Sequence, residues 1–170
     1  MPISLASPDA ADRPFAARAR ARLTAYAARV LRRQGVKRPL VTVVLGDDRL
    51  LRDLYRRYKR RDRATDVLSF TYEDVPAEGR RGRALSGEIY VSRERLFAQA
   101  RRYRHTPGKE LLRLVTHGLL HLCGHDHMKP GERRVMRAAE RTAMTLDFTR
   151  GDAGAFESVA RTVRPRAARP

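Results

Sequence analysis

The stretch PGKELLRLVTHGLLHLCG, residues 107–124, decides the centre of the fold. Pro107 suits the first turn of a helix, and Gly124 suits its end. Between them the apolar residues recur every three or four positions, the spacing of a helix that buries one face; they are Leu111, Leu114, Val115, Leu119 and Leu122. Two histidines, His117 and His121, stand one helical turn apart in the same stretch. The segment therefore predicts a core helix that also carries metal-binding chemistry.

Shorter patterns on either side of this helix predict the rest of a mixed α+β domain. Apolar runs rich in β-branched residues predict strands over residues 40–45, 66–72 and 87–92. Helical spacing with end signals predicts further helices over residues 15–35, 48–59, 92–104 and 130–146. Helices and strands mix without strict βαβ alternation, so we expect a single domain with a small mixed β-sheet flanked by helices, and a metal site at the end of a helix.

The two ends of the chain differ from its middle. Residues 1–14 are rich in proline, aspartate and small residues, which predicts a flexible leader. Residues 151–170 lose their periodicity and keep four arginines, so we expect a basic, disordered tail. Residues 15–150 then form one folded domain that carries the function.

Composition narrows the class of partner and the compartment. The chain has 37 Lys and Arg against 19 Asp and Glu, a formal net charge of +18 that favours a polyanion such as nucleic acid. Its single cysteine, Cys123, rules out an internal disulfide and suits a reducing compartment, so we expect a cytoplasmic protein. No apolar run approaches the roughly 18 to 20 residues that span a bilayer, so we expect no membrane association.

Four of the five histidines fall within residues 117–127. On a helix, His117 and His121 share one face, and the turn allowed by Gly124 can bring His127 back over the same ion. Three imidazole nitrogens leave a fourth position open, which is typical of catalytic zinc sites rather than structural ones. We therefore expect one zinc ion held by His117, His121 and His127, although imidazole sites also accept nickel, copper or cobalt.

The residues around this cluster have less defined roles. Cys123 follows His121 by two positions, which points it away from the ion and favours a packing role. His125 is open between three roles: supporting a ligand, facing the substrate, or simply being exposed. Asp126 is a candidate to orient a ligand imidazole, and His105 is expected to be solvated. Gly118 stands where zinc proteases need a glutamate, which disfavours a peptidase.

Three motifs resemble one known family. The segment HGLLHLCGHDH, residues 117–127, resembles the signature H-G-x-L-H-L-x-G-Y-D-H of the bacterial rRNA maturation factors, the YbeY-type endoribonucleases, with His125 in place of the tyrosine. TDVLSF, residues 65–70, is similar to the family's T-D/N-V-L-S-F strand, and GEIYVS, residues 87–92, is similar to its G-D-I-x-I-S. Leu114, Met136 and Glu140 also fall where the family tends to place an apolar residue, methionine and glutamate. The resemblance covers residues 40–146.

The resemblance implies a metal-dependent endoribonuclease domain with zinc on His117, His121 and His127. It implies cleavage specific for single-stranded RNA, in maturation of the 16S rRNA 3' end and in ribosome quality control. The implied partners are rRNA and ribosomal particles, with a ribosomal protein or a GTPase as further candidates.

The family also has N-x-x-Y-R before its T-D-V-L-S-F strand. Here Tyr58 matches the tyrosine, but Lys59 occupies the arginine position and Tyr55 the asparagine position. Lysine keeps the charge but lacks the bidentate fork of arginine, so either Lys59 serves or Arg60 or Arg61 substitutes for it.

These residues lie in a basic run, residues 52–63, with seven cations and two acids. We expect Lys59 and His117 to be catalytic, and Tyr58, Lys59, Arg60 and Arg61 to bind the RNA through phosphate contacts and base stacking. No residue identifies itself as the general base; Glu88 and Asp66 are polar neighbours without an assigned role.

Two other functions stay open. The first is a ribosome assembly factor that binds rRNA, with a mainly structural metal and little cleavage. The second is a metal-dependent hydrolase of peptides or small molecules, which Gly118 and the charge disfavour.

Overall fold

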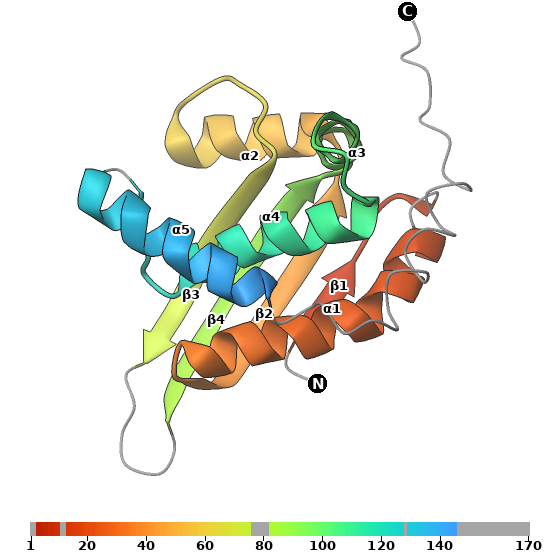
Figure 1. Ribbon diagram of the computed structural model, residues 1–170. Helices are drawn as coiled ribbons and strands as arrows, with labels where there is room; N and C mark the ends of the chain where they lie inside the picture. The colour runs from red at the N-terminus through yellow and green to blue at the C-terminus, as the bar shows by residue number, and fades with distance from the viewer. Residues whose placement is uncertain (1–2, 11–12, 76–81, 128, 146–170) are drawn as a thin grey trace, which may run out of the picture.

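The computed structural model describes residues 3–10, 13–75, 82–127 and 129–145, and Figure 1 shows how their elements are arranged. The elements in chain order are β1 (Ile3–Ala6), α1 (Arg13–Arg33), β2 (Val36–Gly46), α2 (Asp48–Lys59), β3 (Val67–Val75), β4 (Arg83–Ser92), α3 (Arg93–Arg102), α4 (Pro107–Leu122) and α5 (Pro130–Met144). Every helix and strand expected from the sequence is present in these ranges, and β1 is added to them.

The strands form one mixed sheet in the order β1-β2-β4-β3. β2 pairs in parallel with both β1 and β4, whereas β3 pairs with β4 in antiparallel fashion. The prediction of a single α+β domain with one small mixed sheet is therefore confirmed. The element ends differ from those expected. β2 and β4 begin earlier in the chain, at Val36 and Arg83 instead of residues 40 and 87, and β3 continues to Val75.

The prediction of a flexible leader over residues 1–14 is wrong for residues 3–6, which form β1. Ile3 lies opposite Val41 of β2, and Leu5 lies opposite Val43. Ile3 and Leu5 are only 4% and 2% exposed. Four residues are too few to show a strand pattern by themselves, and it is pairing with β2 that makes them a strand.

One other prediction about a flexible region cannot be compared with the structure. The basic tail expected over residues 151–170 lies outside the described residues.

The core lies between one face of the sheet and helices α1 and α4 (Figure 1). Ile89 of β4 is fully buried there, and α4 approaches it closely at Gly118: a Cβ on Gly118 would lie 2.7 Å from Cγ2 of Ile89. Tyr26 of α1 and Thr116 of α4 share a buried hydrogen bond of 2.6 Å. α4 is thus fixed against both the sheet and α1, which positions the histidines it carries.

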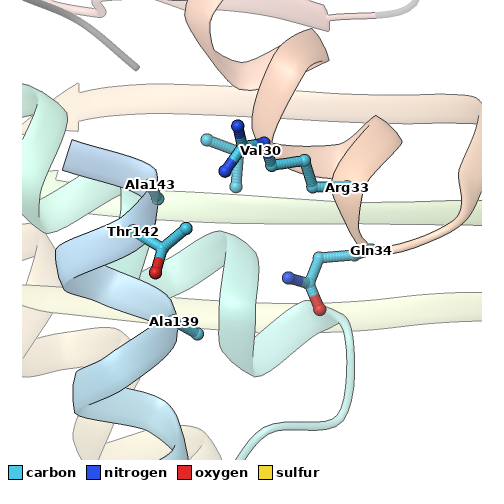
Figure 2. Close-up of a pocket in the computed structure, with 6 residues that line it drawn as sticks. All are labelled: Val30, Arg33, Gln34, Ala139, Thr142 and Ala143. Atoms are coloured by element: carbon cyan, nitrogen blue, oxygen red, sulfur yellow. The ribbon is translucent and has the colours of Figure 1, made fainter. Parts of the chain in front are cut away.

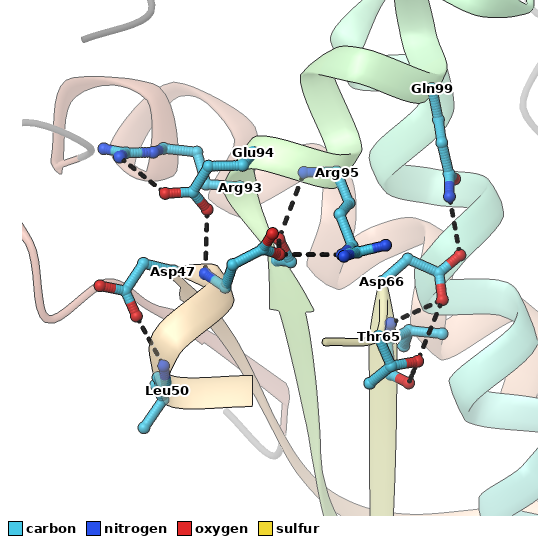
Figure 3. A network of polar contacts seen from close by, with 11 residues as sticks. Asp47, Leu50, Thr65, Asp66, Arg93, Glu94, Arg95 and Gln99 are labelled. Atoms are coloured by element: carbon cyan, nitrogen blue, oxygen red, sulfur yellow. Dashed lines mark hydrogen bonds and ion pairs between the residues drawn. The ribbon is translucent and has the colours of Figure 1, made fainter. Parts of the chain in front are cut away.

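Side chains cap the starts of three helices, α2, α3 and α4. Asp47 accepts a hydrogen bond from the backbone N of Leu50 (2.8 Å) at the start of α2, as Figure 3 shows. Ser92 caps α3, and Thr106 caps α4 ahead of Pro107. Each side-chain oxygen satisfies a backbone N–H that has no partner within its helix. Among the described residues, no helix combines the length and the apolar character needed to cross a membrane.

Candidate metal centre

The end of α4 brings His117, His121 and His127 together. Each offers one ring nitrogen, and these three nitrogens lie within 4.8 Å of one another. His117 and His121 stand one turn apart on α4, with their Nε2 atoms 3.2 Å from each other. Nitrogens bound tetrahedrally to one zinc ion at about 2.0 to 2.1 Å are separated by about 3.3 Å, so this pair fits the spacing that zinc requires.

His127 reaches the cluster because the chain turns sharply after α4. Gly124 has φ +90°, in the left-handed region that favours glycine. The backbone N of His125 donates to the carbonyl of Leu120 (3.0 Å), which closes the end of the helix. Asp126 then accepts a hydrogen bond from the backbone N of His127 (2.7 Å). The turn after α4 therefore brings His127 close to His117 and His121, as the sequence predicts.

A carboxylate from α5 orients one of the three imidazoles. Oε1 of Glu140 lies 2.7 Å from Nδ1 of His117. A proton held on Nδ1 by this carboxylate leaves Nε2 of His117 free to ligate a metal. The hydrogen bond to His117 holds the pKa of Glu140 below its usual value. The sequence motif placed Glu140 near the site but gave it no role, because a contact 23 residues away depends on how α5 packs.

The surroundings of His121 favour its neutral form. Burial lowers the pKa of His121, and the neighbouring His117 and His127 lower it further. Neutral histidine is the form that binds a metal, so this residue is suited to act as a ligand.

Cys123 has the packing role expected of it. The residue is partly buried against the hydrophobic core, and burial raises the pKa of its thiol to about 11. A thiol this hard to ionise is a poor metal ligand at neutral pH.

The structure shows contacts for three other residues discussed above. His125, whose role was left open, turns toward the end of α1, with Nε2 2.8 Å from Oε1 of Gln34. Asp126 accepts a hydrogen bond from the backbone N of His127, and its role in orienting a ligand imidazole stays a prediction; the carboxylate on Nδ1 of His117 is that of Glu140. His105, expected to be solvated, is partly buried with Nδ1 3.2 Å from the buried carboxylate of Glu110.

The four residues expected to bind RNA lie around the C-terminal end of α2. Lys59 ends the helix, and Arg60 follows in the left-handed region with φ +53°. Lys59, Arg60 and Arg61 are all exposed. Tyr58 is 59% exposed, and its ring lies 5.0 Å from that of Phe70 on β3. The structure thus groups these four residues at the surface.

The described hydrogen bonds and ion pairs do not join this basic group to the three histidines. Both α2 and α4 contact β3, β4 and α3, so these three elements connect the basic group with the histidines. In Figure 1 the C-terminal ends of α2 and α4 lie toward the β3 edge of the sheet.

The two carboxylates without an assigned role are both engaged elsewhere. Glu88 accepts hydrogen bonds from the hydroxyls of Tyr72 and Tyr90, each 2.6 Å long. Asp66 accepts from Nε2 of Gln99 (2.9 Å), a contact drawn in Figure 3. Neither belongs to the cluster of three histidines found among the described residues.

A separate cavity of about 330 Å³ lies between the ends of α1 and α5 (Figure 2). Its lining combines small and polar side chains: Val30, Arg33, Gln34, Ala139, Thr142 and Ala143. None of the three clustered histidines lines it. We therefore place the candidate chemistry at the histidines and not in this cavity.

Comparisons with known proteins point to one family. A family model described as Endoribonuclease YbeY matches residues 11–146. A relative named Endoribonuclease YbeY from Anaeromyxobacter dehalogenans (strain 2CP-C) is 38% identical over 129 residues, covering 76% of this chain and 65% of its own length. Another of that name from Myxococcus xanthus (strain DK1622) is 41% identical over 100 residues, covering 59% of this chain and 34% of its own length. These matches confirm the resemblance that the motifs indicate.

A solved structure shares the fold. The solution structure of TM1509 from Thermotoga maritima matches with a TM-score of 0.58 at 23% identity, covering 98% of this chain and 99% of that one. The matched part of the chain spans about two thirds and about one third of the two curated relatives described above.

Proposed function

Because this chain belongs to the YbeY endoribonuclease family, we propose that it is a metal-dependent endoribonuclease that cuts single-stranded RNA in the cytoplasm. We propose zinc as its metal, and maturation of the 16S rRNA 3' end with ribosome quality control as the processes it serves. The observation that carries the proposal is the cluster of three histidine nitrogens within 4.8 Å of one another. The formal charge of +18 supports a polyanionic substrate.

Within this proposal, His117, His121 and His127 hold one ion, and Glu140 keeps His117 in the tautomer that can bind it. A zinc ion bound there supplies a Lewis acid that polarises a phosphoryl oxygen or activates water. His117 is therefore assigned to catalysis as a ligand. The three-nitrogen donor set supports an open site, because a closed structural site would use a fourth protein ligand.

The basic end of α2 supplies the contacts to RNA in this proposal. Lys59 neutralises charge on the reacting phosphate, with Arg60 and Arg61 beside it as further phosphate contacts. The exposed ring of Tyr58 offers a surface on which an unpaired base can stack. The proposed partners are rRNA and ribosomal particles, with a ribosomal protein or a GTPase as candidates for delivering the substrate.

Lys59 also supports a second candidate function. It stands where the family motif has an arginine, and lysine binds phosphate as a point charge without the bidentate fork. A chain that binds rRNA but cuts it poorly would act as an assembly factor with a mainly structural metal.

Cleavage of labelled single-stranded and duplex RNA by purified protein, with and without a chelator, separates the two candidates. His117→Ala removes a ligand, and Lys59→Ala removes the expected phosphate contact. His125→Ala is the matched control, because it removes a histidine of the same segment that faces Gln34 instead of the cluster.

A nuclease predicts cutting of the single strand that stops with chelator and in His117→Ala, but continues in His125→Ala. Tight RNA binding without cleavage under any added metal would favour the assembly factor instead. Cleavage that continues in the metal-free protein would reject the metal-dependent mechanism.

A further inference from the structure

Beyond its first turn, the accessible face of α4 is a single line of three side chains. Between Glu110 and Leu122 every residue of the helix is buried except Arg113, His117 and His121. These three follow one another at intervals of four residues, so they stack along one face with about 5 to 6 Å between successive Cβ atoms. Two of them belong to the candidate metal centre, and the third is an arginine. An RNA strand that extends from the metal centre toward the N-terminal end of this face meets Arg113.

The guanidinium of Arg113 is held in a fixed position. Its Nε and Nη2 donate to Oε1 of Glu110, at 2.9 and 2.6 Å. Nη2 also donates to Oε1 of Gln99 (2.8 Å). Glu110 is fully buried, whereas the side chain of Arg113 is 36% exposed. The Glu110 carboxylate is thus shielded from solvent, whereas the Arg113 guanidinium is partly exposed to solvent.

One donor group of this guanidinium remains unused. None of the described residues accepts a hydrogen bond from Nη1 of Arg113, although Nε and Nη2 are both engaged. An arginine whose fork is already ordered loses little conformational entropy when it makes one more contact. Nη1 is therefore a preorganised donor one helical turn from His117.

Arg113 is held by residues of two helices, Glu110 of α4 and Gln99 of α3. Gln99 of α3 also donates through Nε2 to Asp66, just before β3, at 2.9 Å (Figure 3). On the other side, the charge of Arg113 is among the causes that lower the pKa of Glu140, the carboxylate bound to His117. Arg113 therefore lies within electrostatic range of the metal centre and is not an isolated surface cation.

We propose that Arg113 is a substrate-binding residue, whose guanidinium contacts a phosphate of the RNA strand next to the metal centre. The inference rests on the proposed nuclease function and adds a second source of phosphate contact, on α4 rather than on α2. Arginine suits this position because its planar fork can bind Glu110 along one edge and phosphate along another. A purely structural role, as the counter-ion of Glu110, is the competing explanation.

The test removes the cation without leaving a buried charge unpaired. Glu110→Gln alone keeps Arg113, and the double variant Glu110→Gln/Arg113→Gln removes it, so the comparison between these two isolates the guanidinium. Arg20→Gln on α1 is the matched control for the loss of one exposed cation. Thermal unfolding of each variant confirms that it is folded.

The readouts are binding of a labelled single-stranded RNA at several salt concentrations, and kcat/KM for its cleavage. The slope of log Kobs against log salt concentration measures the number of phosphate contacts. We expect this slope to be shallower by about 0.7 in the double variant than in Glu110→Gln, as for the loss of one phosphate contact on a single strand. Its affinity should fall about 5- to 10-fold, with kcat/KM falling at least as far, while Arg20→Gln matches the unmodified protein. Equal slopes for the double variant and Glu110→Gln would overturn the inference and leave Arg113 as a counter-ion only.

A second measurement uses the unmodified protein and needs no variant to fold. An arginine-selective dicarbonyl reagent labels exposed guanidinium groups, and mass spectrometry reports the extent at each position. Bound RNA should slow the labelling of Arg113 and leave Arg20 unaffected; equal labelling of Arg113 with and without RNA would overturn the inference. RNA binding and protection from the reagent are measured independently of cleavage. If the protein proves not to be a nuclease, these measurements still show whether Arg113 contacts RNA.

Discussion

His117 uses its two ring nitrogens for different tasks. Nδ1 meets Glu140 of α5, and Nε2 faces Nε2 of His121 at 3.2 Å. A carboxylate on the outer nitrogen fixes the ring orientation and makes the inner nitrogen a stronger ligand. The quality of the candidate site therefore depends on a residue that does not itself belong to the ligand set.

Replacing this carboxylate should weaken metal binding without disturbing the fold. We expect Glu140→Ala to lower zinc affinity about 10- to 100-fold, the usual effect of removing a partner that orients a ligand. Competition with a chelating dye measures this affinity. Glu73→Ala, which removes an exposed carboxylate on β3, should bind zinc as the unmodified protein does. Unchanged zinc affinity in Glu140→Ala would show that His117 needs no support from α5.

Glu88 affects the ionisation of two tyrosines on neighbouring strands, Tyr72 of β3 and Tyr90 of β4. Its hydrogen bond raises the pKa of Tyr72 to about 12, and burial together with the same carboxylate raises the pKa of Tyr90 further. The folded state thus holds the phenol protons more firmly than the unfolded chain does. The resulting stabilisation is complete below about pH 10, the ordinary tyrosine pKa, and is lost as the pH rises through about 12 for Tyr72.

Removal of the charge on Glu88 should shift this titration toward ordinary values. We expect Glu88→Gln to lower the pKa of both Tyr72 and Tyr90, because the neutral amide no longer repels a tyrosinate. Absorbance of tyrosinate during an alkaline titration measures the change. Glu73→Gln serves as the charge-matched control. Superimposable titration curves for Glu88→Gln and the unmodified protein would contradict the assigned cause.

At the scale of elements, α4 lies close to the sheet because Gly118 has no side chain. A Cβ there would lie 2.7 Å from Cγ2 and 3.1 Å from Cδ1 of the buried Ile89. In the sequence, Gly118 stands where zinc proteases need a glutamate, and its packing role cannot be seen there. Its structural role is to let the helix that carries the histidines approach β4.

We expect Gly118→Ala to destabilise the protein by about 1 to 3 kcal/mol, the usual cost of overpacking a core. Urea unfolding measures the change. Combined with Ile89→Ala, the substitution should cost less than the sum of the two single changes, because the obstructing side chain is gone. Gly131→Ala on α5, where a new Cβ meets no atom within 4 Å, is the control and should be neutral or stabilising. Strict additivity of Gly118→Ala and Ile89→Ala would argue against the close approach.

The end of α2 carries a local strain. Arg60 caps the helix in the left-handed region at φ +53°, where a residue with a Cβ is disfavoured relative to glycine. We expect Arg60→Gly to raise the free energy of unfolding by about 0.5 to 1 kcal/mol. Urea unfolding again measures it, with Arg57→Gly inside the helix as a control that should lose about 1 kcal/mol. A loss of stability in Arg60→Gly would mean that the arginine side chain contributes more than the strain costs.

At the scale of the whole molecule, the N-terminal residues complete the sheet. Leu5 is buried on the same face as Val43, its partner on β2, although residues 1–14 look like a flexible leader in the sequence. We expect Leu5→Ala to cost about 2 to 5 kcal/mol, as for other large-to-small changes in a core. Ser4→Ala, on the exposed face of the same strand, should change stability by less than about 0.5 kcal/mol. Equal stability of both variants in thermal or urea unfolding would restore the leader interpretation.

Much of this fold could be predicted because its signals are local. Asp47, Ser92 and Pro107 mark helix starts through contacts within one turn, so residues next to one another in the chain carry the information. The three histidines follow the same logic, since two lie one turn apart and the third follows the glycine that ends the helix. The assignment of Lys59 to catalysis stays a prediction, because no described contact connects it with the cluster.

The sequence by itself determined the helix that carries the histidines, the mixed character of the domain, the clustering of His117, His121 and His127, and the basic end of α2. Each of these depends on the spacing of residues that are close together in the sequence, so the pattern of residue types is enough to predict it. Only the tertiary structure decided that Glu140 orients His117, that Ile3 and Leu5 form a strand, and that Arg113 shares the open face of α4. These features depend on which surfaces pack together, because burial and long-range hydrogen bonds join residues whose separation along the chain carries no pattern.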